Sequence, residues 1–408
     1  MKKNKFDTRV VVTGLGVVSS LGIGWQLFWK NLLAGKSGIS RITLFDTSKY
    51  DRHYGGEVKN FDSNQFMDKR RARTIGRASQ MAIAATKLAL KDAKLDLKSI
   101  KNKNTTVCVG TTMGEPQIME ELDEKYYPKN KKIKVDFHSA LRYPSNTISM
   151  NISTFLKVRG KSIMFSTACS SGNYAVAYAY DAIKTRKCDM ALAGGVDALS
   201  RIAFTGFGRI FAMAPEKCQP FDKNRQGMIV GEGAGMLILE SLESARKRKA
   251  KIYAEILGYG MSCDAYHMTD PSVEGIKKVI KKALGNSHIK SDDIDYISAH
   301  GTGTKENDQA ECQALHQVFK GRADKIPISS IKSMLGHTMG AASAFESIAC
   351  CLAIKFGIIP PTINFTQRDP MCDIYCVPDK SIRKKLKIVL NNSQAFGGNN
   401  ACIVLKKF

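Results

Sequence analysis

The sequence has no long apolar run and no paired cysteine framework. No apolar stretch approaches the ~20 residues that a membrane-spanning helix needs. The basic start, residues 1–5, is like that of a signal peptide, but residues 13–16 interrupt the apolar run that follows. The eleven cysteines are an odd number, and Cys372 and Cys376 lack the second pair that a zinc finger requires. We therefore expect a cytoplasmic protein in a reducing compartment, with no membrane contact.

Acidic residues are also scarce. Asp and Glu number 37 against 62 Lys and Arg, which gives a formal net charge of +25. The basic residues occur in many short groups, such as 69–73, 246–251 and 277–282. Two explanations remain open: a solvated, lysine-rich surface, or a surface that attracts an acidic partner. Nucleic acid is not the expected partner, because the sequence has no RNP-like, zinc-finger or helix-turn-helix signature.

Strand and helix patterns alternate along all 408 residues. In the first part we expect strands at 9–12, 107–110, 161–165 and 190–193, and helices at 25–33, 78–93 and 147–156. In the second part we expect strands at 252–258, 294–299, 326–329, 387–391 and 401–405, and helices at 273–284, 307–319 and 340–355. This alternation predicts an α/β fold with a mostly parallel sheet, built from two similar halves at 1–250 and 251–408.

Two glycine clusters are weak matches to a dinucleotide-binding loop. Gly14-Leu-Gly16 has Ser19 where a third glycine is required, and we expect a turn there after the first strand. Gly231-Glu-Gly-Ala-Gly235 also lacks the third glycine, and no helix start follows it. Close packing of a strand is the better interpretation of the second cluster.

Cys169 lies between a short apolar strand and an Ala-rich helix expected near 174–180. Small residues at this junction allow a sharp turn that places Cys169 at the first helical turn. Unpaired N–H groups and the helix dipole favour a thiolate at this position, and the same N–H groups could hold an oxyanion. This setting indicates a nucleophile. The alternative is a small buried apolar residue, which is the usual role of a cysteine.

Two histidines occupy similar places. His300 follows the strand expected at 294–299 and begins His300-Gly-Thr-Gly-Thr304, and His337 precedes the small-residue helix start at 340–342. Glycines beside each histidine allow a ligand to approach the backbone. A lone histidine is more often structural, but two at strand ends favour a functional site.

Four motifs resemble those of a known enzyme family. Thr167-Ala-Cys-Ser-Ser-Gly172, His300-Gly-Thr-Gly-Thr304, Lys332-Ser-Met-Leu-Gly-His337 and Phe396-Gly-Gly398 are similar to the active-site motifs of the β-ketoacyl-acyl-carrier-protein synthases of the thiolase superfamily. The resemblance spans the chain in order and is closest to the elongating type II enzymes. It implies a thiolase-like layered αβαβα fold, with the active site where the two halves meet.

The resemblance also implies roles for individual residues. Cys169 would take an acyl group from acyl carrier protein, and His300 and His337 would stabilise the enolate formed when malonyl loses carbon dioxide. Lys332 would fix His337, and the backbone N–H groups of Cys169 and Phe396 would form an oxyanion hole. The remaining implied residues are Thr302 and Thr304 as phosphopantetheine or malonyl contacts, Gly397 and Gly398 in the gating loop, and Glu346 and Asp308 in support. No metal or redox cofactor is implied.

Neighbouring families differ at these positions. A thiolase would carry a second cysteine where this chain has His337, the initiating type III synthases pair their histidine with asparagine, and a chain-length factor would lack the nucleophile. The intact set therefore favours a decarboxylating elongation enzyme. It also argues against a second class of function, a non-catalytic partner that only binds carrier protein.

Two segments depart from the fatty-acid pattern. Gln394-Ala395 stands where a phenylalanine and a glycine are usual, and the segment containing Met113 replaces a more glycine-rich one that lines the acyl pocket. Our hypothesis is that Gln394, Ala395 and Met113 change the acyl chain accepted, toward a polyene or polyketide intermediate. Sequence drift within an ordinary fatty-acid enzyme is the alternative.

The resemblance gives the basic groups a partner, because carrier proteins of this system are acidic. The matching carrier contacts are Lys69, Arg70, Arg71, Arg73 and, less securely aligned, Arg209. Family members form dimers, and the sequence leaves open a homodimer or a heterodimer with a related ketosynthase or chain-length-factor chain.

Overall fold

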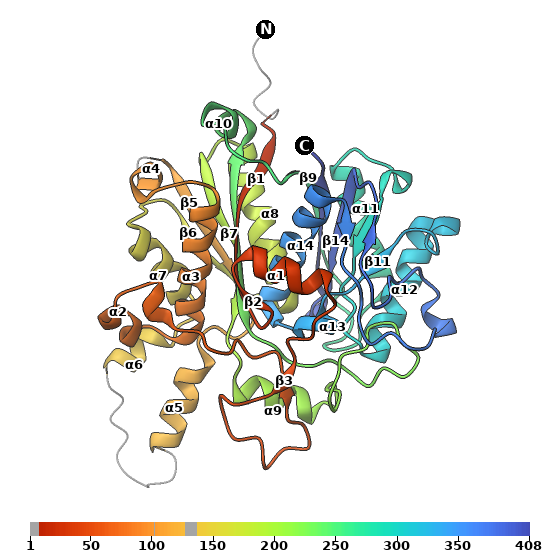
Figure 1. Ribbon diagram of the computed structural model, residues 1–408, viewed down its shortest axis with the longest axis horizontal. Coiled ribbons are helices and arrows are strands. Elements are labelled where there is room, and N and C mark those ends of the chain that lie inside the picture. Colours follow the sequence, from red (N-terminus) through yellow and green to blue (C-terminus); the bar gives the residue numbers. More distant parts are fainter. Residues whose placement is uncertain (1–7, 102, 127–136) are drawn as a thin grey trace.

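The computed structural model describes residues 8–101, 103–126 and 137–408 (Figure 1). The basic start at residues 1–5 lies outside the described residues. The first half contributes β1 (Val10–Ser19), β5 (Thr105–Gly110), β6 (Ser162–Phe165), β7 (Met190–Asp197) and β8 (Gly233–Ser241). The second contributes β9 (Ala254–Cys263), β10 (Tyr296–Ser298), β11 (Ile328–Ser329), β14 (Ile388–Ser393) and β15 (Asn399–Lys406).

The two halves have the same strand succession. Spatial order in the first half is β6-β5-β7-β8-β1, and in the second half it is β11-β10-β14-β15-β9. In each half, the third of these five strands along the chain, β6 or β11, is therefore at the outer edge of the sheet. The first of the five, β1 or β9, is at the inner edge. A short antiparallel ladder between β1 and β9, at Val10 to Val12, joins the two. The expected boundary near residue 250 falls between β8 and β9.

The prediction of a mostly parallel sheet was wrong in detail. Strands β5, β6 and β7 are parallel, as are β10, β11 and β14, but β8 and β15 run antiparallel to their neighbours. Strands β14 and β15 are separated by a short loop at residues 394–398, and so short a connection can only produce an antiparallel pair.

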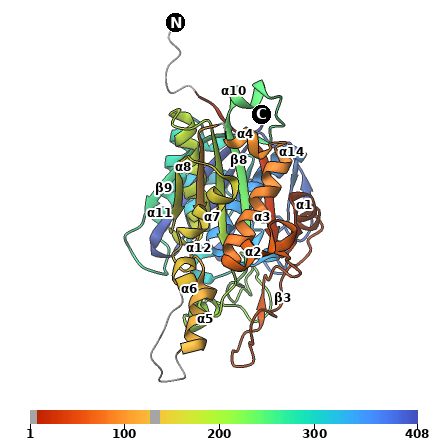
Figure 2. The same cartoon turned by 90° about the vertical axis from the view of Figure 1, so that its left-hand side faces the viewer.

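Helices form three layers around this sheet. Helices α3 (Arg77–Asp92) and α7 (Thr147–Leu156) cover the outer face of the first half (Figure 2). Helices α8 (Ser171–Lys184) and α14 (Ala342–Phe356) lie between the halves, where their small side chains pack in one large core. Helices α11 (Val273–Asn286) and α12 (Lys305–Phe319) cover the outer face of the second half (Figure 1). The predicted αβαβα layering is confirmed.

Some helices were predicted to the residue and others were missed. Helix α1 (Trp25–Leu33) and α7 have the predicted bounds. The helices that were not predicted include α2 (Lys69–Thr74), α5 (Pro116–Tyr126), α6 (Phe137–Arg142) and α9 (Arg201–Arg209). Local caps start two of them: Asp68 accepts a hydrogen bond from the N–H of Arg71, and Ser200 accepts one from the N–H of Ala203.

The glycines of Gly14-Leu-Gly16 lie inside β1 and not in a turn, which corrects the expectation from the sequence. A Cβ at Gly16 would lie 1.8 Å from the carbonyl oxygen of Ala85, and one at Gly14 would lie 2.4 Å from that of Ala89. Helix α3 therefore lies directly on the backbone of β1, and glycine is needed for this close approach. The cluster at 231–235 has the expected packing role, since a Cβ at Gly235 would lie 3.2 Å from Ile348 Cδ1.

Replacing Gly16 by alanine is expected to lower the free energy of unfolding by about 2–4 kcal/mol, because α3 must move away from the sheet. The matched control is Gly206→Ala in α9, where an added Cβ meets nothing within 4 Å. That control should be neutral or stabilising by up to ~1 kcal/mol, since alanine is the better helix former. Urea unfolding of both variants tests this. Equal stabilities would contradict the packing explanation.

One described segment, Met339–Phe356, is long and apolar enough to cross a membrane by length and composition. In the fold, 89% of this window is buried, and most of it forms α14 between the two halves. Its apolar composition is therefore explained by its place in the core.

Candidate active site

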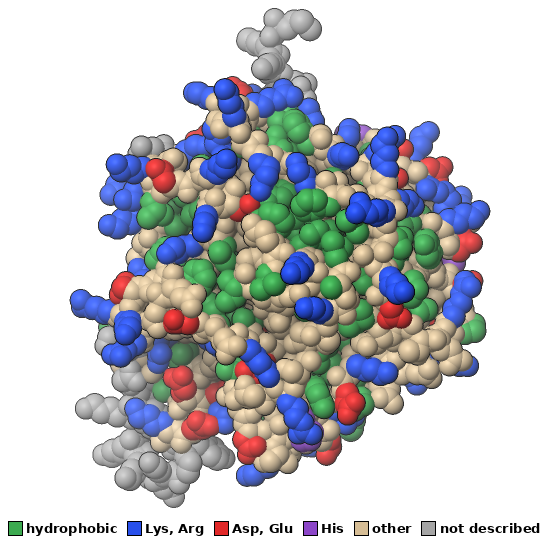
Figure 3. Space-filling view, in the orientation of Figure 1, with side chains coloured by type: hydrophobic (Ala, Val, Ile, Leu, Met, Phe, Trp, Pro, Cys, Tyr) green, Lys and Arg blue, Asp and Glu red, His purple; other side chains and the backbone are tan. Residues whose placement is uncertain are grey.

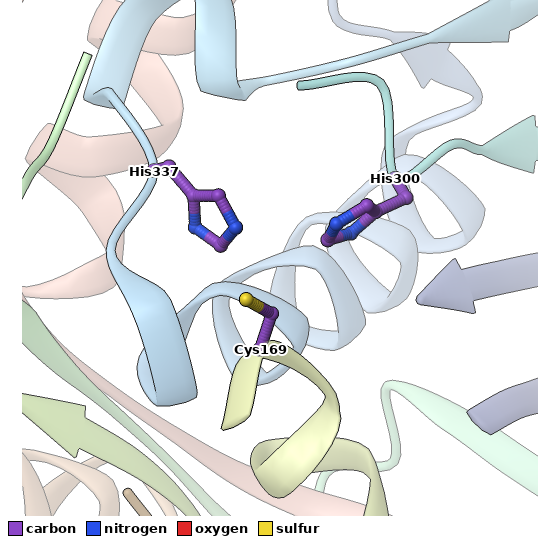
Figure 4. Close-up of side chains that lie close together, drawn as sticks. All are labelled: Cys169, His300 and His337. Carbon is purple, nitrogen blue, oxygen red and sulfur yellow. The ribbon is translucent and has the colours of Figure 1, made fainter. Parts of the chain in front are cut away.

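The chemistry-bearing residues meet where the parallel strands end. Figure 4 shows Cys169, His300 and His337 pointing toward one another from three separate segments. The Cys169 sulfur and one nitrogen from each imidazole lie within 4.8 Å of one another, and the centroids of the two imidazole rings are 5.4 Å apart, with the ring planes at 82°. Each follows the carboxyl end of a strand: Cys169 follows β6 in the first half, and His300 and His337 follow β10 and β11 in the second half. This is where open α/β sheets commonly bind ligands.

Cys169 is held on a tight turn immediately before α8. The turn is a 3₁₀ segment, Ala168–Ser170, in which Ala168 has a φ of 49°. Few residues other than glycine adopt this region, so the turn stores backbone strain at the nucleophile. The hydroxyl of Ser393, at the end of β14, donates to the carbonyl oxygen of Cys169 at 3.4 Å. The strand and the turn thus fix the position of the sulfur.

The resting form of Cys169 differs from the sequence expectation. Burial raises the pKa of its thiol to about 12, although the Lys332 ammonium and the N–H groups of Phe396 and Cys169 act in the opposite direction. The sequence had suggested a thiolate, because the helix N-terminus is visible in the sequence and the complete burial is not. The N–H groups of Cys169 and Phe396 do face the sulfur, where an oxyanion hole requires them.

Alkylation of Cys169 by iodoacetamide is expected to rise about tenfold per pH unit from pH 7 to 10 without a plateau. The thiolate is the reactive form, and with a raised pKa its fraction is still increasing throughout this range. Mass spectrometry of the Cys263→Ala protein, which lacks the exposed thiol, gives the rates. A plateau below pH 8 would show instead that the helix N-terminus outweighs burial.

Both histidines are neutral hydrogen-bond donors. Burial, followed by the nearby Lys332 ammonium, holds the pKa of each imidazole well below its usual range. The N–H of Met339 donates to His337 Nδ1 at 3.1 Å, and Lys332 Nζ lies 3.3 Å from His300 Nδ1. A backbone N–H and an ammonium can only donate, so the Nδ1 atoms of both histidines accept. Each Nε2 therefore carries the proton, which leaves it as a donor for the site.

Lys332 positions His300 and not His337, which corrects the role inferred from the resemblance. It lies in α13 (Lys332–Leu335), and its ammonium also donates to the carbonyl oxygen of His300 at 2.7 Å and to Glu346. Glu346 is buried on α14, and burial raises the pKa of its carboxyl to about 7 against the opposing effect of Lys332. This pair joins the segment of His300 to the central helix layer.

Two acidic residues on α12 hold the loop that follows His300. Glu311 accepts from the N–H groups of His300 and Gly301, at 2.9 and 2.8 Å. Asp308 accepts from the N–H of Thr302 at 3.1 Å, in agreement with the supporting position expected for it. The sequence analysis missed Glu311, although it lies three residues after Asp308 on α12 and therefore on the same face of the helix.

A small cavity opens over Cys169. Of the residues predicted to bind substrate, Thr302, Thr304, Gln394, Phe396 and Gly398 line it, together with both histidines. Gly398 has a φ of 76°, and a Cβ there would lie 2.6 Å from that of Asp264, so this gating-loop position requires glycine. Gly397 stands outside the lining and donates its N–H to the carbonyl oxygen of Met268. Met268 and Phe207 line the cavity and were not predicted.

Met113 does not line this cavity. It packs in the same apolar cluster as Met228 and Phe207, which do line it. Asp197 fixes the Met113 segment by accepting from the N–H groups of Thr112 and Met113, at 2.8 and 2.9 Å. Burial raises the pKa of Asp197 to about 6. Asp197 also accepts from the N–H of Gly340, so it links the two halves beneath the site, and nothing in its local sequence indicated this.

The predicted carrier contacts lie in two places. Lys69, Arg70, Arg71 and Arg73 are on α2 at the outer side of the first half, and Arg209 ends α9 beneath the middle of the molecule (Figure 1). Arg71 differs from the rest, because it donates to the carbonyl oxygen of Asn151 at 3.0 Å and lies over the ring of Phe155. It therefore connects α2 to α7, whereas Lys69, Arg70, Arg73 and Arg209 are exposed.

A sulfur and two imidazole nitrogens are also a donor set that zinc accepts. Here, however, both Nε2 atoms carry protons and the thiol pKa is raised, while the Lys332 ammonium adds positive charge beside His300. The arrangement offers hydrogen-bond donors and not lone pairs. It suits an anion that forms during a reaction better than a bound cation.

The chain matches two family models, "Beta-ketoacyl synthase, N-terminal domain" at residues 7–245 and "Beta-ketoacyl synthase, C-terminal domain" at 253–366. It belongs to the β-ketoacyl synthase family. The 3-oxoacyl-[acyl-carrier-protein] synthase 2 of Synechocystis sp. is 36% identical, over 98% of both chains. The family, its acyltransferase class and the thiolase-like fold were predicted from the motifs, and all three are confirmed.

Solved ketosynthases have the same architecture. The ishigamide ketosynthase/chain length factor structure matches with a TM-score of 0.96 and 43% identity, covering 98% of this chain and 99% of that one. A second structure, AntDE:AntF, is a type II polyketide acyl-carrier protein in complex with its ketosynthase bound to the hexaketide. It matches with a TM-score of 0.91 and 32% identity, covering 98% of this chain and 99% of that one.

Proposed function

We propose that this ketosynthase catalyses decarboxylating Claisen condensation between an acyl group on Cys169 and malonyl on acyl carrier protein. The carrying observation is the pair of neutral imidazoles, each with a ring nitrogen close to the Cys169 sulfur and with its proton on Nε2. Donors fixed in a buried site stabilise negative charge that develops there during the reaction. The product is a β-ketoacyl chain longer by two carbons.

The loading step is a thioester exchange. Cys169 sulfur attacks the acyl carbonyl, and the resulting oxyanion accepts hydrogen bonds from the N–H groups of Cys169 and Phe396. When the carbon–sulfur bond to the carrier breaks, the thiol proton of Cys169 passes to the carrier sulfur. Because the carrier sulfur gains the proton that the Cys169 thiol loses, the step needs no other group to take up a proton. This agrees with the buried thiol and with two histidines that already carry a proton on Nε2.

In the condensation step, the malonyl carboxylate leaves as carbon dioxide and its bonding electrons form an enolate. The Nε2–H groups of His300 and His337 donate to the enolate oxygen. The enolate carbon attacks the acyl carbonyl on Cys169, and the N–H groups of Cys169 and Phe396 again hold the oxyanion. Its collapse releases the β-ketoacyl carrier and a Cys169 thiolate, which takes up a proton. No metal or redox cofactor takes part in either step.

A surface hollow adjoins the cavity and provides a path for the phosphopantetheine arm of the carrier protein. The hollow shares Thr304 and Phe396 with the cavity and is also lined by the exposed Lys305 and by Phe211, which is 91% exposed. Thr302 and Thr304 hydroxyls are 2.9 Å apart at this junction. We assign them to the pantetheine or malonyl amide and carbonyl groups, and Lys305 to the phosphate.

Intact-protein mass spectrometry tests the function directly. The purified protein is incubated with a panel of saturated and polyunsaturated acyl-carrier proteins and then with malonyl-carrier protein. Acylation of the enzyme, followed by a β-keto product two carbons longer on the carrier, is expected. No loading from any carrier would contradict a catalytic role for the chain alone.

A second candidate is the ketosynthase subunit of a specialised type II polyketide or polyene pathway that works with a partner subunit. The 43% identity to the ishigamide ketosynthase structure supports it, and so does the Gln394-Ala395 departure. The same panel distinguishes the pathways, since the best-loaded chain identifies the substrate class. Native mass spectrometry with and without a co-expressed chain-length-factor homologue distinguishes a homodimer from a heterodimer.

Cytoplasmic localisation stays a prediction.

We propose that α2 and the end of α9 dock the acidic carrier protein. Lysine and arginine side chains outnumber acidic ones over the visible face of the molecule (Figure 3), so an acidic partner is attracted broadly and specific contacts must select the site. The exposed Lys69, Arg73 and Arg209 are suited to such contacts. Arg71 is not, because it holds α2 against α7.

Reversing the charge of Lys69 and Arg73 together, to glutamate, is expected to lower kcat/KM for carrier-bound substrate about tenfold at low salt. Exposed charge pairs act mainly on encounter and are screened by salt, so the difference from wild type should shrink at high ionic strength. Lys247→Glu, on α10 (Leu242–Lys247) at the opposite end of the molecule, is the control. An unchanged rate at every salt concentration would contradict docking at α2.

A further inference from the structure

Gln394 is a buried amide without a partner. It directly follows β14, is 2% exposed, and lines the cavity beside Cys169 and Phe396. Neither its Nε2 nor its Oε1 makes a hydrogen bond to any described residue. The buried polar side chains of His300, His337, Thr302 and Asn307, which also line the cavity, all have protein partners.

A buried amide without a protein partner can form its hydrogen bonds with a group on a bound substrate. Leaving a buried donor and acceptor unpaired costs free energy, so buried polar groups are normally paired. The cavity wall also has an apolar part, with Phe207, Ala212, Met228 and Met268 among the lining residues. A hydrocarbon chain in this cavity would leave the amide unpaired, whereas a polar substituent would pair with it.

The chemistry of the amide limits the substituent. The NH₂ group donates and the carbonyl oxygen accepts, so the best neutral partner both accepts and donates. A hydroxyl group does both. A carboxylate only accepts, which would leave Oε1 facing negative charge, so the malonyl carboxylate is a poor partner. Since Ser393 is hydrogen-bonded to the carbonyl oxygen of Cys169, the adjacent amide lies near the start of a chain attached to that sulfur.

We propose that Gln394 selects acyl chains that carry a hydroxyl group close to the thioester over hydrocarbon chains of the same length. This inference rests on the proposed function, because the chain it reads is the acyl group carried by Cys169. In this role Gln394 is a specificity-determining residue that touches the substrate without taking part in bond making.

A competition assay tests the proposal. The enzyme is given equal amounts of 3-hydroxyacyl-carrier and saturated acyl-carrier protein of equal chain length, and the two adducts on Cys169 are measured by intact-protein mass spectrometry. Wild type should favour the hydroxylated chain by about tenfold, the value of one hydrogen bond in a buried site. Gln394→Met keeps the side-chain length without the amide and should remove this preference. Gln65→Met, at an exposed position, should retain it.

The ratio of two adducts in one sample cancels any loss of folded protein. If wild type loads neither chain nor any other acyl group, the proposed function fails. If both chains load and the ratio is the same in wild type and Gln394→Met, the function stands and the selection by Gln394 is overturned. An equal loss of both adducts in the variant leaves their ratio unchanged and overturns the selection for the same reason.

Discussion

Cys169→Ala is expected to abolish acylation of the enzyme and to lower the condensation rate by roughly four to six orders of magnitude. Removing the nucleophile removes the covalent route. Because His300 and His337 act together with the Cys169 thioester, they should provide little of the rate without it. Stability should change little, because alanine keeps the buried turn compact. The adduct is measured by intact-protein mass spectrometry, and the product by carrier-protein mass.

Cys263→Ala is the matched control for this variant. Cys263 is the exposed cysteine and the one most accessible to non-enzymatic transfer from a thioester. Its removal should leave the enzymatic adduct and the rate unchanged. If Cys169→Ala retained a stoichiometric adduct that Cys263→Ala lacked, Cys169 would not be the nucleophile, and the proposed mechanism would be wrong.

Replacing His300 or His337 by alanine is expected to leave acyl loading intact while slowing decarboxylation of malonyl-carrier protein about 10²- to 10³-fold. Each imidazole supplies one fixed donor to the enolate oxygen, and losing one such donor has an effect of this size. Both imidazoles stay neutral because burial lowers their pKa, so the wild-type decarboxylation rate should show no acid limb near pH 6.5. Release of carbon dioxide, followed between pH 5.5 and 8, provides the measurement.

His316→Ala on α12 is the control, since its imidazole bonds to the carbonyl oxygen of Asp373 away from the cavity. It should decarboxylate malonyl at the wild-type rate. Should His337→Ala lose loading and decarboxylation equally, the histidine would be acting on the nucleophile and not on the enolate. An acid limb centred near pH 6.5 would likewise contradict two permanently neutral donors.

Much of the fold was predictable from local pattern. Helices α1 and α7 were predicted to the residue from their apolar periodicity, while α2 and α9, which each begin at a capping side chain, were missed. Gly16 was expected in a turn, because glycine permits either a turn or a close approach. Only the position of Ala85 on α3 distinguishes the two.

The sequence by itself selected Cys169, His300 and His337 as the candidate site and determined the layered fold and the family, because each depends on residue types at fixed spacings within short motifs. The tertiary structure decided how these groups behave. Complete burial raises the pKa of the Cys169 thiol, Met339 and Lys332 set the histidine tautomers, and Lys332 contacts His300 instead of His337. It also leaves the Gln394 amide at the cavity wall without a hydrogen-bond partner among the described residues. Charge state and pairing depend on desolvation and on distances between groups far apart in the chain, and neither quantity is present in a local pattern.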